Sequence, residues 1–306
     1  MTNMTRKHKL SLHVDVVKRV ALLAPATFFI ALFLFLPLGL VVTYSFLEKA
    51  QFGGVIWEFS LAAYEQLAFE HDIFTGELSV NLAYAGIILR SLLHAISATV
   101  LCALVGVPMA YYIATLSPRH QSMMLLLITV PYWVNLLVRT VSMLFIIRNE
   151  GPLNTFLIWL GLISEPLHIA YTNTAIQIGL VYSYLPFMVL PIYAAVERFD
   201  FRLLEAAHDL YAGRWTALVT VLIPAIAPGI VAGAILVFIP CIGAYIAPDL
   251  LGGGKELMIG NTIALQFQSS RNWPFGASLS VILMSIVLIA LFLLARMARH
   301  GKGHKS

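Results

Sequence analysis

The stretch Val221–Pro248, VLIPAIAPGIVAGAILVFIPCIGAYIAP, contains no Asp, Glu, Lys or Arg. A helix needs about 20 predominantly apolar residues to cross a hydrocarbon core roughly 30 Å thick. This stretch exceeds that length. Its prolines and glycines are tolerated in membrane helices, because neighbouring groups can satisfy the backbone atoms that they free. The stretch therefore predicts a transmembrane helix.

Similar runs recur along the chain, which is 60% hydrophobic and only 11% charged. A soluble domain carries about 25% charged residues. We therefore predict an all-α membrane protein with about six transmembrane helices. The five further predicted spans are Val20–Phe46, Ser91–Leu116, Met123–Ile147, Thr174–Val196 and Phe275–Ala295.

The predicted spans divide the chain into three regions. Residues 1–85 comprise an N-terminal cytoplasmic segment, the first span and an external loop or small helical cap at 48–84. Residues 86–296 form the core with five spans and a cytoplasmic loop at 197–220. Residues 297–306 form a basic cytoplasmic tail.

The distribution of basic residues predicts the orientation. With six spans, the two termini, the turn at residues 117–121 and the segment 197–220 fall on one side, and that side carries 13 of the 19 Lys and Arg residues. Basic residues accumulate in cytoplasmic loops. We therefore expect both termini in the cytoplasm. Because this bias accounts for the formal net charge of +4, no nucleic-acid partner is expected.

The cytoplasmic segment 197–220 predicts an exposed amphipathic helix. Its apolar residues Leu203, Leu204, Ala207, Leu210 and Tyr211 follow helical spacing. We expect nothing in its own chain to cover that apolar face, which is typical of a helix that docks into a partner's groove.

This segment also resembles a known signature. Glu205-Ala206-Ala207, continuing to Ile223-Pro224, is similar to the EAA motif of ABC importer permeases. The resemblance implies a coupling helix that docks into a cleft of a cytoplasmic ATPase dimer. The coupling residues that it implies are Glu205, Ala206, Ala207, Asp209, Leu210, Tyr211 and Gly213.

One position departs from that motif. The family usually has Gly where this chain has Tyr211, and Gly213 follows two residues later. A Gly would permit a left-handed turn after the helix. The geometry of the turn at Tyr211 is therefore left open.

An ordered series of further motifs covers roughly residues 86–296 and resembles the spermidine/putrescine-type permeases. The motifs are Val130-Pro131-Tyr132-Trp133 through Arg139-Thr140, Gly151-Pro152-Leu153-Asn154, GLVYSYLPFMVLP at residues 179–191, DLLGG at 249–253, Ile259-Gly260-Asn261 and RNWPFG at 271–276. The resemblance implies a type I ABC importer permease fold in the bacterial inner membrane. It implies a polyamine as the solute, although the wider subgroup also imports other small solutes.

The resemblance also implies the partners. They are a second homologous permease subunit, the cytoplasmic ABC ATPase dimer, a periplasmic solute-binding protein and membrane lipid. No cofactor is expected in this chain, because ATP and magnesium would bind the partner ATPase.

Five residues are candidates for the translocation pathway. Arg139 is the only Lys, Arg, Asp or Glu well inside a predicted span, where it costs about 2.5–3.5 kcal/mol on insertion scales. It snorkels or holds a helix broken after Pro131, or else it lines or gates the route. Tyr182 and Tyr184 precede Pro186, which frees a backbone carbonyl. They either line the pathway, where their rings would attract ammonium groups, or pack between helices.

The other two candidates, Tyr245 and Asp249, end the fifth predicted span near the outer mouth. They either receive a cation there or serve as an interfacial aromatic residue and a solvated loop residue.

Other functional classes fit less well. An ion-coupled secondary transporter tends to place ionisable residues at the midplane and to show repeated halves. An intramembrane enzyme would need a metal or nucleophile cluster, and none is evident. The run Gly252–Lys255 predicts a turn rather than an ATP site, because Glu256 follows it. We therefore expect a transport subunit without its own ATPase site.

Overall fold

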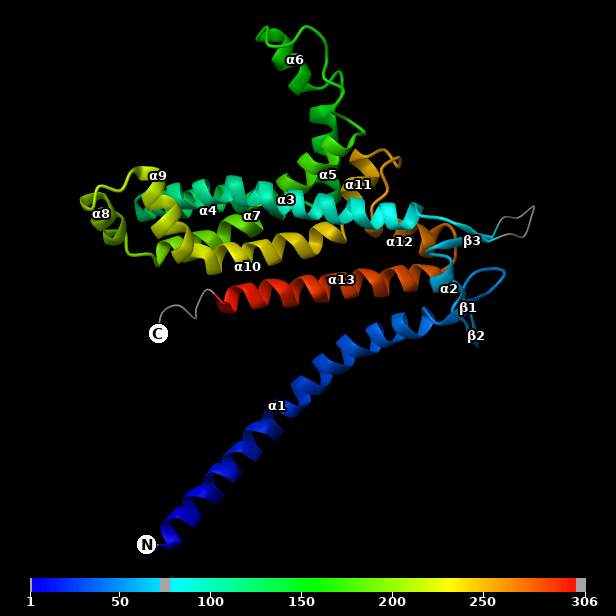
Figure 1. Ribbon diagram of the computed structural model, residues 1–306, viewed down its shortest axis with the longest axis horizontal. Helices are drawn as coiled ribbons and strands as arrows, with labels where there is room; N and C mark the ends of the chain where they lie inside the picture. The colour runs from blue at the N-terminus through cyan, green and yellow to red at the C-terminus, as the bar shows by residue number, and fades with distance from the viewer. Residues whose placement is uncertain (1, 72–77, 301–306) are drawn as a thin grey trace.

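The structure is a computed structural model that describes residues 2–71 and 78–300, and these are mainly helical (Figure 1). In chain order the elements are α1 (Thr2–Tyr44), β1 (Leu47–Lys49), β2 (Val55–Phe59), α2 (Ala62–Glu65), β3 (Phe69–His71), β4 (Leu78–Val80), α3 (Ala83–Ala114), α4 (Pro118–Trp133), α5 (Leu136–Ile147), α6 (Pro152–Trp159), α7 (Asn173–Glu197), α8 (Arg202–Asp209), α9 (Arg214–Ala217), the π-helical turn η1 (Leu218–Leu222), α10 (Ile223–Ile242), α11 (Ile246–Leu251), α12 (Ile259–Gln268) and α13 (Trp273–His300).

Five stretches of helix are long and apolar enough to cross a membrane. They are Leu23–Tyr44, Ala83–Ala114, Asn173–Glu197, Arg214–Ile242 and Trp273–Leu294. A sixth crossing results if α4 and the bent continuation through α5 and α6 count as one. The predicted all-α membrane fold is confirmed, and two of its spans need correction.

The third predicted span, Met123–Ile147, is not one straight helix. The axis of α4 and that of residues 136–159 differ by 97°. Val134 and Asn135 between them are extended, with ψ of 139° and 137°. The Asn135 side chain accepts a hydrogen bond from the Leu137 amide at 2.9 Å, which caps a new helix. Pro131 removes a backbone donor from the last turn of α4.

The fifth predicted span, Val221–Pro248, is displaced toward the N-terminus. Its helix starts at Arg214, passes through η1 and ends at Ile242. The chain then turns at Gly243 and forms the separate short helix α11. The apolar sequence continues past the turn because α11 is itself buried, at Ala247, Pro248 and Leu251.

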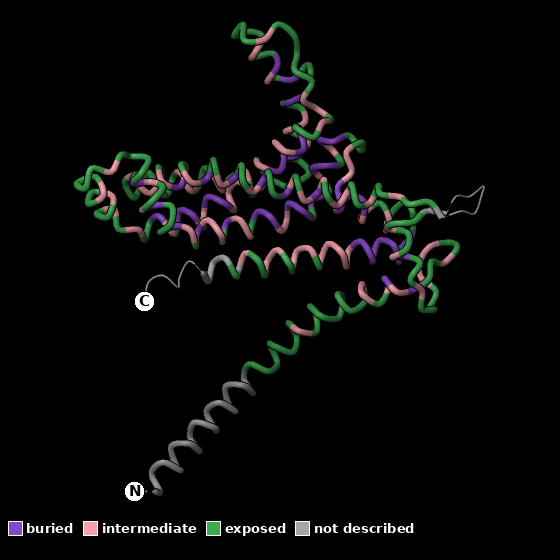
Figure 2. The backbone as a smooth tube through the Cα atoms, in the orientation of Figure 1, coloured by how far each residue is buried: buried purple, intermediate pink, exposed green. Residues whose placement is uncertain are grey.

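Helices α3, α7 and α10 form the centre of the bundle. Buried residues line the faces that these helices turn toward one another (Figure 2). The buried residues of α3 recur every three or four positions and are mostly small: Ser91, Ala95, Ala98, Cys102, Gly106, Ala110 and Ile113. Small residues at helical spacing let membrane helices approach closely, and they account for this packing.

Two glycines of α10 bring its backbone against α7. A Cβ at Gly229 would lie 2.6 Å from the Ala195 Cβ and 2.8 Å from the Pro191 carbonyl oxygen. A Cβ at Gly233 would lie 2.7 Å from the Met188 sulfur. Glycine is therefore required at both positions for this separation of the helices.

The two ends of the bundle carry different structures. The antiparallel ribbons β1–β2 and β3–β4 lie with α2 at the end where α13 begins, and α8 and α9 lie at the opposite end (Figure 1). The region 48–84 thus contains short ribbons as well as the small helix that was predicted. The ring of Tyr44 stacks on Trp273 at 6.3 Å and joins the end of α1 to α13. Residues 301–306 of the predicted tail lie outside the described residues.

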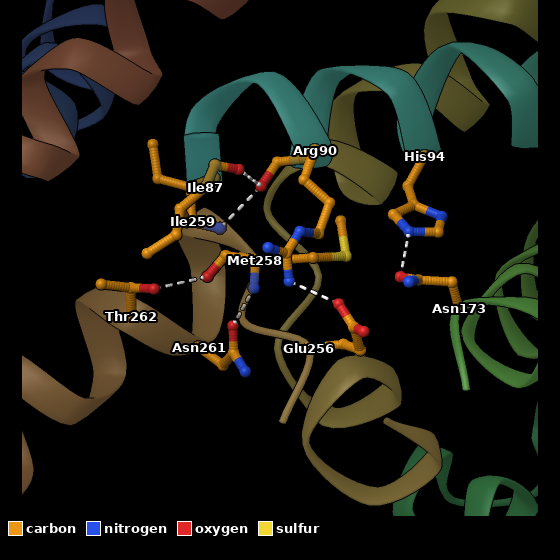
Figure 3. Close-up of polar contacts among 10 residues, drawn as sticks. Ile87, Arg90, His94, Asn173, Glu256, Met258, Ile259, Asn261 and Thr262 are labelled. Atoms are coloured by element: carbon orange, nitrogen blue, oxygen red, sulfur yellow. Dashed lines mark hydrogen bonds and ion pairs between the residues drawn. The ribbon is translucent and has the colours of Figure 1, made fainter. Parts of the chain in front are cut away.

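Polar contacts tie the start of α3 to α12 and to the loop before it (Figure 3). The buried Ser91 hydroxyl accepts a hydrogen bond from the Ile259 amide at 2.7 Å and donates one to the Ile87 carbonyl at 2.8 Å. Arg90 forms an ion pair with Glu256. These contacts fix the loop before α12 on the bundle.

The tripeptide Ile259-Gly260-Asn261 has a structural role in that loop. The Asn261 side-chain oxygen accepts a hydrogen bond from the Met258 amide at 2.6 Å, which caps α12. A Cβ at Gly260 would lie 2.5 Å from the Gly243 carbonyl oxygen. The motif therefore seats α12 against the turn that ends α10.

His94 links two spans. Its Nε2 lies 2.9 Å from the Asn173 side-chain oxygen and its Nδ1 lies 2.9 Å from the Gln177 side-chain oxygen. The imidazole thereby joins α3 to the first turns of α7 through polar contacts.

Candidate functional site

The predicted coupling segment, residues 197–220, forms a projection at one end of the bundle (Figure 1). The Asp200 side chain accepts a hydrogen bond from the Arg202 amide at 3.1 Å, where α8 begins. The ring of Phe201 lies 6.2 Å from that of Tyr111 on α3. These contacts hold α8 against the bundle.

Helix α8 turns one side to its own chain and the other outward. Leu204 packs against the hydrophobic core and Ala207 is half-buried. Leu203, Leu210 and Tyr211 have exposed fractions of 52%, 81% and 98%. The expectation that the chain covers none of the apolar face is therefore wrong for Leu204, because the preceding loop folds α8 back onto the bundle. The other three residues form an exposed apolar surface.

The turn after α8 is left-handed although its residue is tyrosine. Tyr211 has φ of 61°. Its amide donates to the His208 carbonyl at 2.9 Å, and the Ala212 amide donates to the Ala207 carbonyl at 3.0 Å. These two hydrogen bonds form the Schellman motif that usually requires Gly. Gly213 does not supply the left-handed residue, since its φ is −64° and it precedes α9.

The remaining residues of the predicted coupling set lie on the same projection. Glu205, Ala206, Asp209 and Gly213 are exposed. Trp215 adds a further large exposed ring, with an exposed fraction of 81%. The projection thus combines apolar side chains with carboxylates, as a protein-docking surface does.

Three adjoining cavities lie where α4, α5, α7 and α10 meet. A cavity of about 400 Å³ is lined by Arg139 and Tyr184. A second, of about 270 Å³, shares Tyr184 and adds Tyr245. A third, of about 240 Å³, shares Arg139 and adds Tyr182. The structure therefore brings four of the five predicted pathway residues together, whereas Asp249 is exposed on α11 and lines none of these cavities.

Arg139 holds the break in the third crossing. Its side chain is 7% exposed, and its Nη2 donates to the carbonyls of Tyr132 at 3.2 Å and Val134 at 2.9 Å. The last carbonyls of a helix have no partner within it and carry its negative dipole end. The guanidinium carbon lies 4.8 Å from the centroid of the Tyr132 ring. Arg139 thus both holds the broken helix and lines the cavities.

Aromatic rings form much of the wall beside Arg139. Tyr132 meets Phe187 edge-on at 4.8 Å, and Tyr184 stacks on Phe187 at 6.4 Å. The Tyr184 hydroxyl donates to the Pro240 carbonyl at 3.3 Å. Sequence reasoning missed Tyr132, Phe187 and Pro240 as lining residues. The three-residue spacing of Tyr184 and Phe187 on one helix face was the available signal.

Among the residues whose side chains the structure describes (23–69, 79–294 and 296), no set of three His, Cys, Asp or Glu residues is placed to hold a metal ion. Gly253 and Gly254 have φ of 63° and 72° and form the turn after α11.

Known proteins of similar sequence are membrane components of transport systems. Residues 103–300 match the family described as the binding-protein-dependent transport system inner membrane component. The chain is 38% identical to the spermidine/putrescine transport system permease protein PotB of Escherichia coli (strain K12), over 88% of this chain and 94% of that protein. It is 42% identical to PotB of Haemophilus influenzae, over 71% of this chain and 76% of that protein.

A solved structure shares the fold. It is the crystal structure of a bacterial alginate ABC transporter in complex with an alginate pentasaccharide-bound periplasmic protein. The match has a TM-score of 0.63 and 16% identity, and it covers 94% of this chain and 96% of the matched chain.

Proposed function

Because the chain belongs to the family of binding-protein-dependent transport system inner membrane components, we propose that it forms part of the translocation pathway for a polyamine. The protein is a multi-pass inner-membrane permease subunit of an ABC importer. The observation that carries the polyamine assignment is the similarity to PotB over most of both chains.

The wall of the cavities is compatible with a cationic solute. Tyr132, Tyr184 and Phe187 offer aromatic faces, and such faces attract ammonium groups. A non-polyamine small solute is the alternative, and it would have to use the same aromatic wall.

We place the projection at α8 in the cytoplasm and propose that it docks on a partner ATPase dimer. Its exposed Leu210, Tyr211 and Trp215 provide apolar contact area, and Glu205 provides charge. The partner would hydrolyse ATP with magnesium, and a second homologous permease and a periplasmic solute-binding protein would complete the importer. Movement of α8 with the ATPase would then tilt α7 and α10, between which the coupling segment lies.

The test is uptake of radiolabelled putrescine and spermidine by cells that lack other polyamine carriers. The cells express this chain together with the partner subunits proposed above. We expect uptake that stops when ATP is depleted while the proton gradient is maintained. Uptake of neither polyamine, in cells where the complex is assembled, would reject the polyamine assignment. Uptake that follows the proton gradient would reject the ATP-driven mechanism.

A further inference from the structure

The cavity beside Arg139 contains a site suited to a small cation. Two carbonyl oxygens, of Tyr132 and Val134, converge on a single nitrogen, the Nη2 of Arg139. The face of the Tyr132 ring covers the same guanidinium. Helix-terminal carbonyls and aromatic faces both stabilise positive charge.

These acceptors match an ammonium better than they match a guanidinium. A primary ammonium has three N–H donors, and two carbonyls with one ring face can receive all three. A guanidinium has five N–H donors. Here both hydrogen bonds to the carbonyls come from Nη2, and the buried Nε has no partner. Arg139 therefore fills the position of the cation while leaving one of its own donors unsatisfied.

The surroundings do not neutralise Arg139. The residues that line the three cavities, all in the described part of the chain, include no Asp or Glu. A solute ammonium that entered beside the guanidinium would meet a like charge that no lining carboxylate offsets. Both the occupied acceptors and the charge oppose a second cation.

We propose that Arg139 is a built-in cation that occupies an ammonium site of the pathway and so prevents the transported polyamine from binding there. The inference rests on the proposed function for the identity of the solute. Its consequence is a pathway with weak affinity for the cation that it carries. Removal of the guanidinium converts the cavity into a binding site for a primary ammonium.

The test is equilibrium binding of radiolabelled putrescine to the purified, assembled transporter without binding protein or nucleotide. Arg139→Met removes the cation and frees both carbonyls, and Arg139→Gln removes the charge while keeping a polar side chain at the helix break. We expect at least a tenfold gain in saturable binding for both variants. Arg139→Lys, which returns a tethered cation, should bind as weakly as the wild type.

The matched control is Arg148→Met. Arg148 follows α5, with its guanidinium carbon 5.9 Å from the centroid of the Phe145 ring, and lines none of the three cavities. The Arg148→Met substitution removes the same charge from the same part of the chain. No gain in putrescine binding is expected for it. Adding Tyr132→Leu to Arg139→Met should abolish the gain, because the aromatic face is lost.

The inference is overturned if assembled Arg139→Met and Arg139→Gln transporters bind no more putrescine than the wild type. It is also overturned if Arg148→Met gives the same gain, or if the gain survives Tyr132→Leu. Because binding is measured without transport, failure of the proposed function appears separately, as a wild-type transporter that imports no polyamine. A gain in binding would still establish the cation site in that case.

Discussion

The Ala212 amide donates a hydrogen bond to the Ala207 carbonyl at 3.0 Å, across a left-handed Tyr211. Left-handed backbone costs a residue other than Gly about 1–2 kcal/mol, and Asn tolerates it better than most. A β-branched residue with positive φ is a structural outlier. The turn that ends α8 can therefore be tested by residue type.

We expect Tyr211→Gly and Tyr211→Asn to keep the turn and to import polyamine within about twofold of wild type. The uptake rate of Tyr211→Val should fall about fivefold or more. A penalty near 1 kcal/mol lowers the population of molecules with the native turn by about that factor. Initial uptake rates at matched membrane levels measure this. Full activity of Tyr211→Val would show that the turn is dispensable, and equal loss in all three would assign the effect to the ring.

Charge reversal on α8 should uncouple the importer. Glu205 is exposed on the proposed docking surface, so Glu205→Lys should abolish uptake and leave membrane insertion intact. Retention of the ATPase on the purified permease measures docking directly. Glu165→Lys, also exposed but in the connection between α6 and α7, is the matched control and should transport normally. Normal uptake by Glu205→Lys would contradict the coupling role.

The proposed orientation can be tested by thiol labelling, because the native Cys102 and Cys241 are both 0% exposed. Phe52→Cys and Tyr211→Cys introduce thiols at positions that are 91% and 98% exposed. A membrane-impermeant maleimide should label the cysteine at position 52 in intact spheroplasts. It should label the one at 211 only in inside-out vesicles. The reverse pattern would invert the topology and remove the ATPase from reach of α8.

Close packing of α10 on α7 predicts a large effect of one methyl group. In Gly229→Ala the new Cβ meets the Pro191 carbonyl oxygen and the Ala195 Cβ, and overpacking of this kind costs about 1–3 kcal/mol. Gly86→Ala in α3 is the control, because nothing lies within 4 Å of its Cβ. Because Gly destabilises a helix relative to Ala, Gly86→Ala should raise the free energy of unfolding by about 0.5–1 kcal/mol. Thermal unfolding midpoints in detergent should move in opposite directions.

The Ser91 hydroxyl should stabilise the contact between α3 and the start of α12. Ser91→Ala leaves the Ile259 amide without its acceptor, and a buried unsatisfied donor costs about 1–3 kcal/mol. Ser122→Ala is the control, because that exposed hydroxyl bonds only the Pro118 carbonyl of its own helix. The free energy of unfolding of Ser122→Ala should stay within about 0.5 kcal/mol of that of the wild type. Equal thermal midpoints for the two variants would argue against this contact.

The spans were predictable because the bilayer imposes both their length and their composition. The break at Val134–Asn135 had a partial signal in Pro131, whereas the capping role of Asn135 depends on where the new helix starts. The end of α10 had a signal in Gly243, but the apolar sequence that continues into the buried α11 concealed it.

Much of the candidate site could not be read from the sequence. The cavities exist only where four helices meet, so Tyr132 and Phe187 could not be assigned to a common wall from their positions in the chain. Tyr211 has a positive φ, which residues other than Gly rarely adopt. The residue type therefore gave no indication of this conformation.

The bent third crossing has a mechanical consequence. A straight helix would transmit a displacement along its axis from Pro118 to α6. The bend of 97° converts such a displacement into a rotation. The bend lies at the wall of the aromatic cavity, where the carbonyls of Tyr132 and Val134 hold the Arg139 side chain. A small rotation of α4 would therefore change the shape of the cavity before it displaced α6.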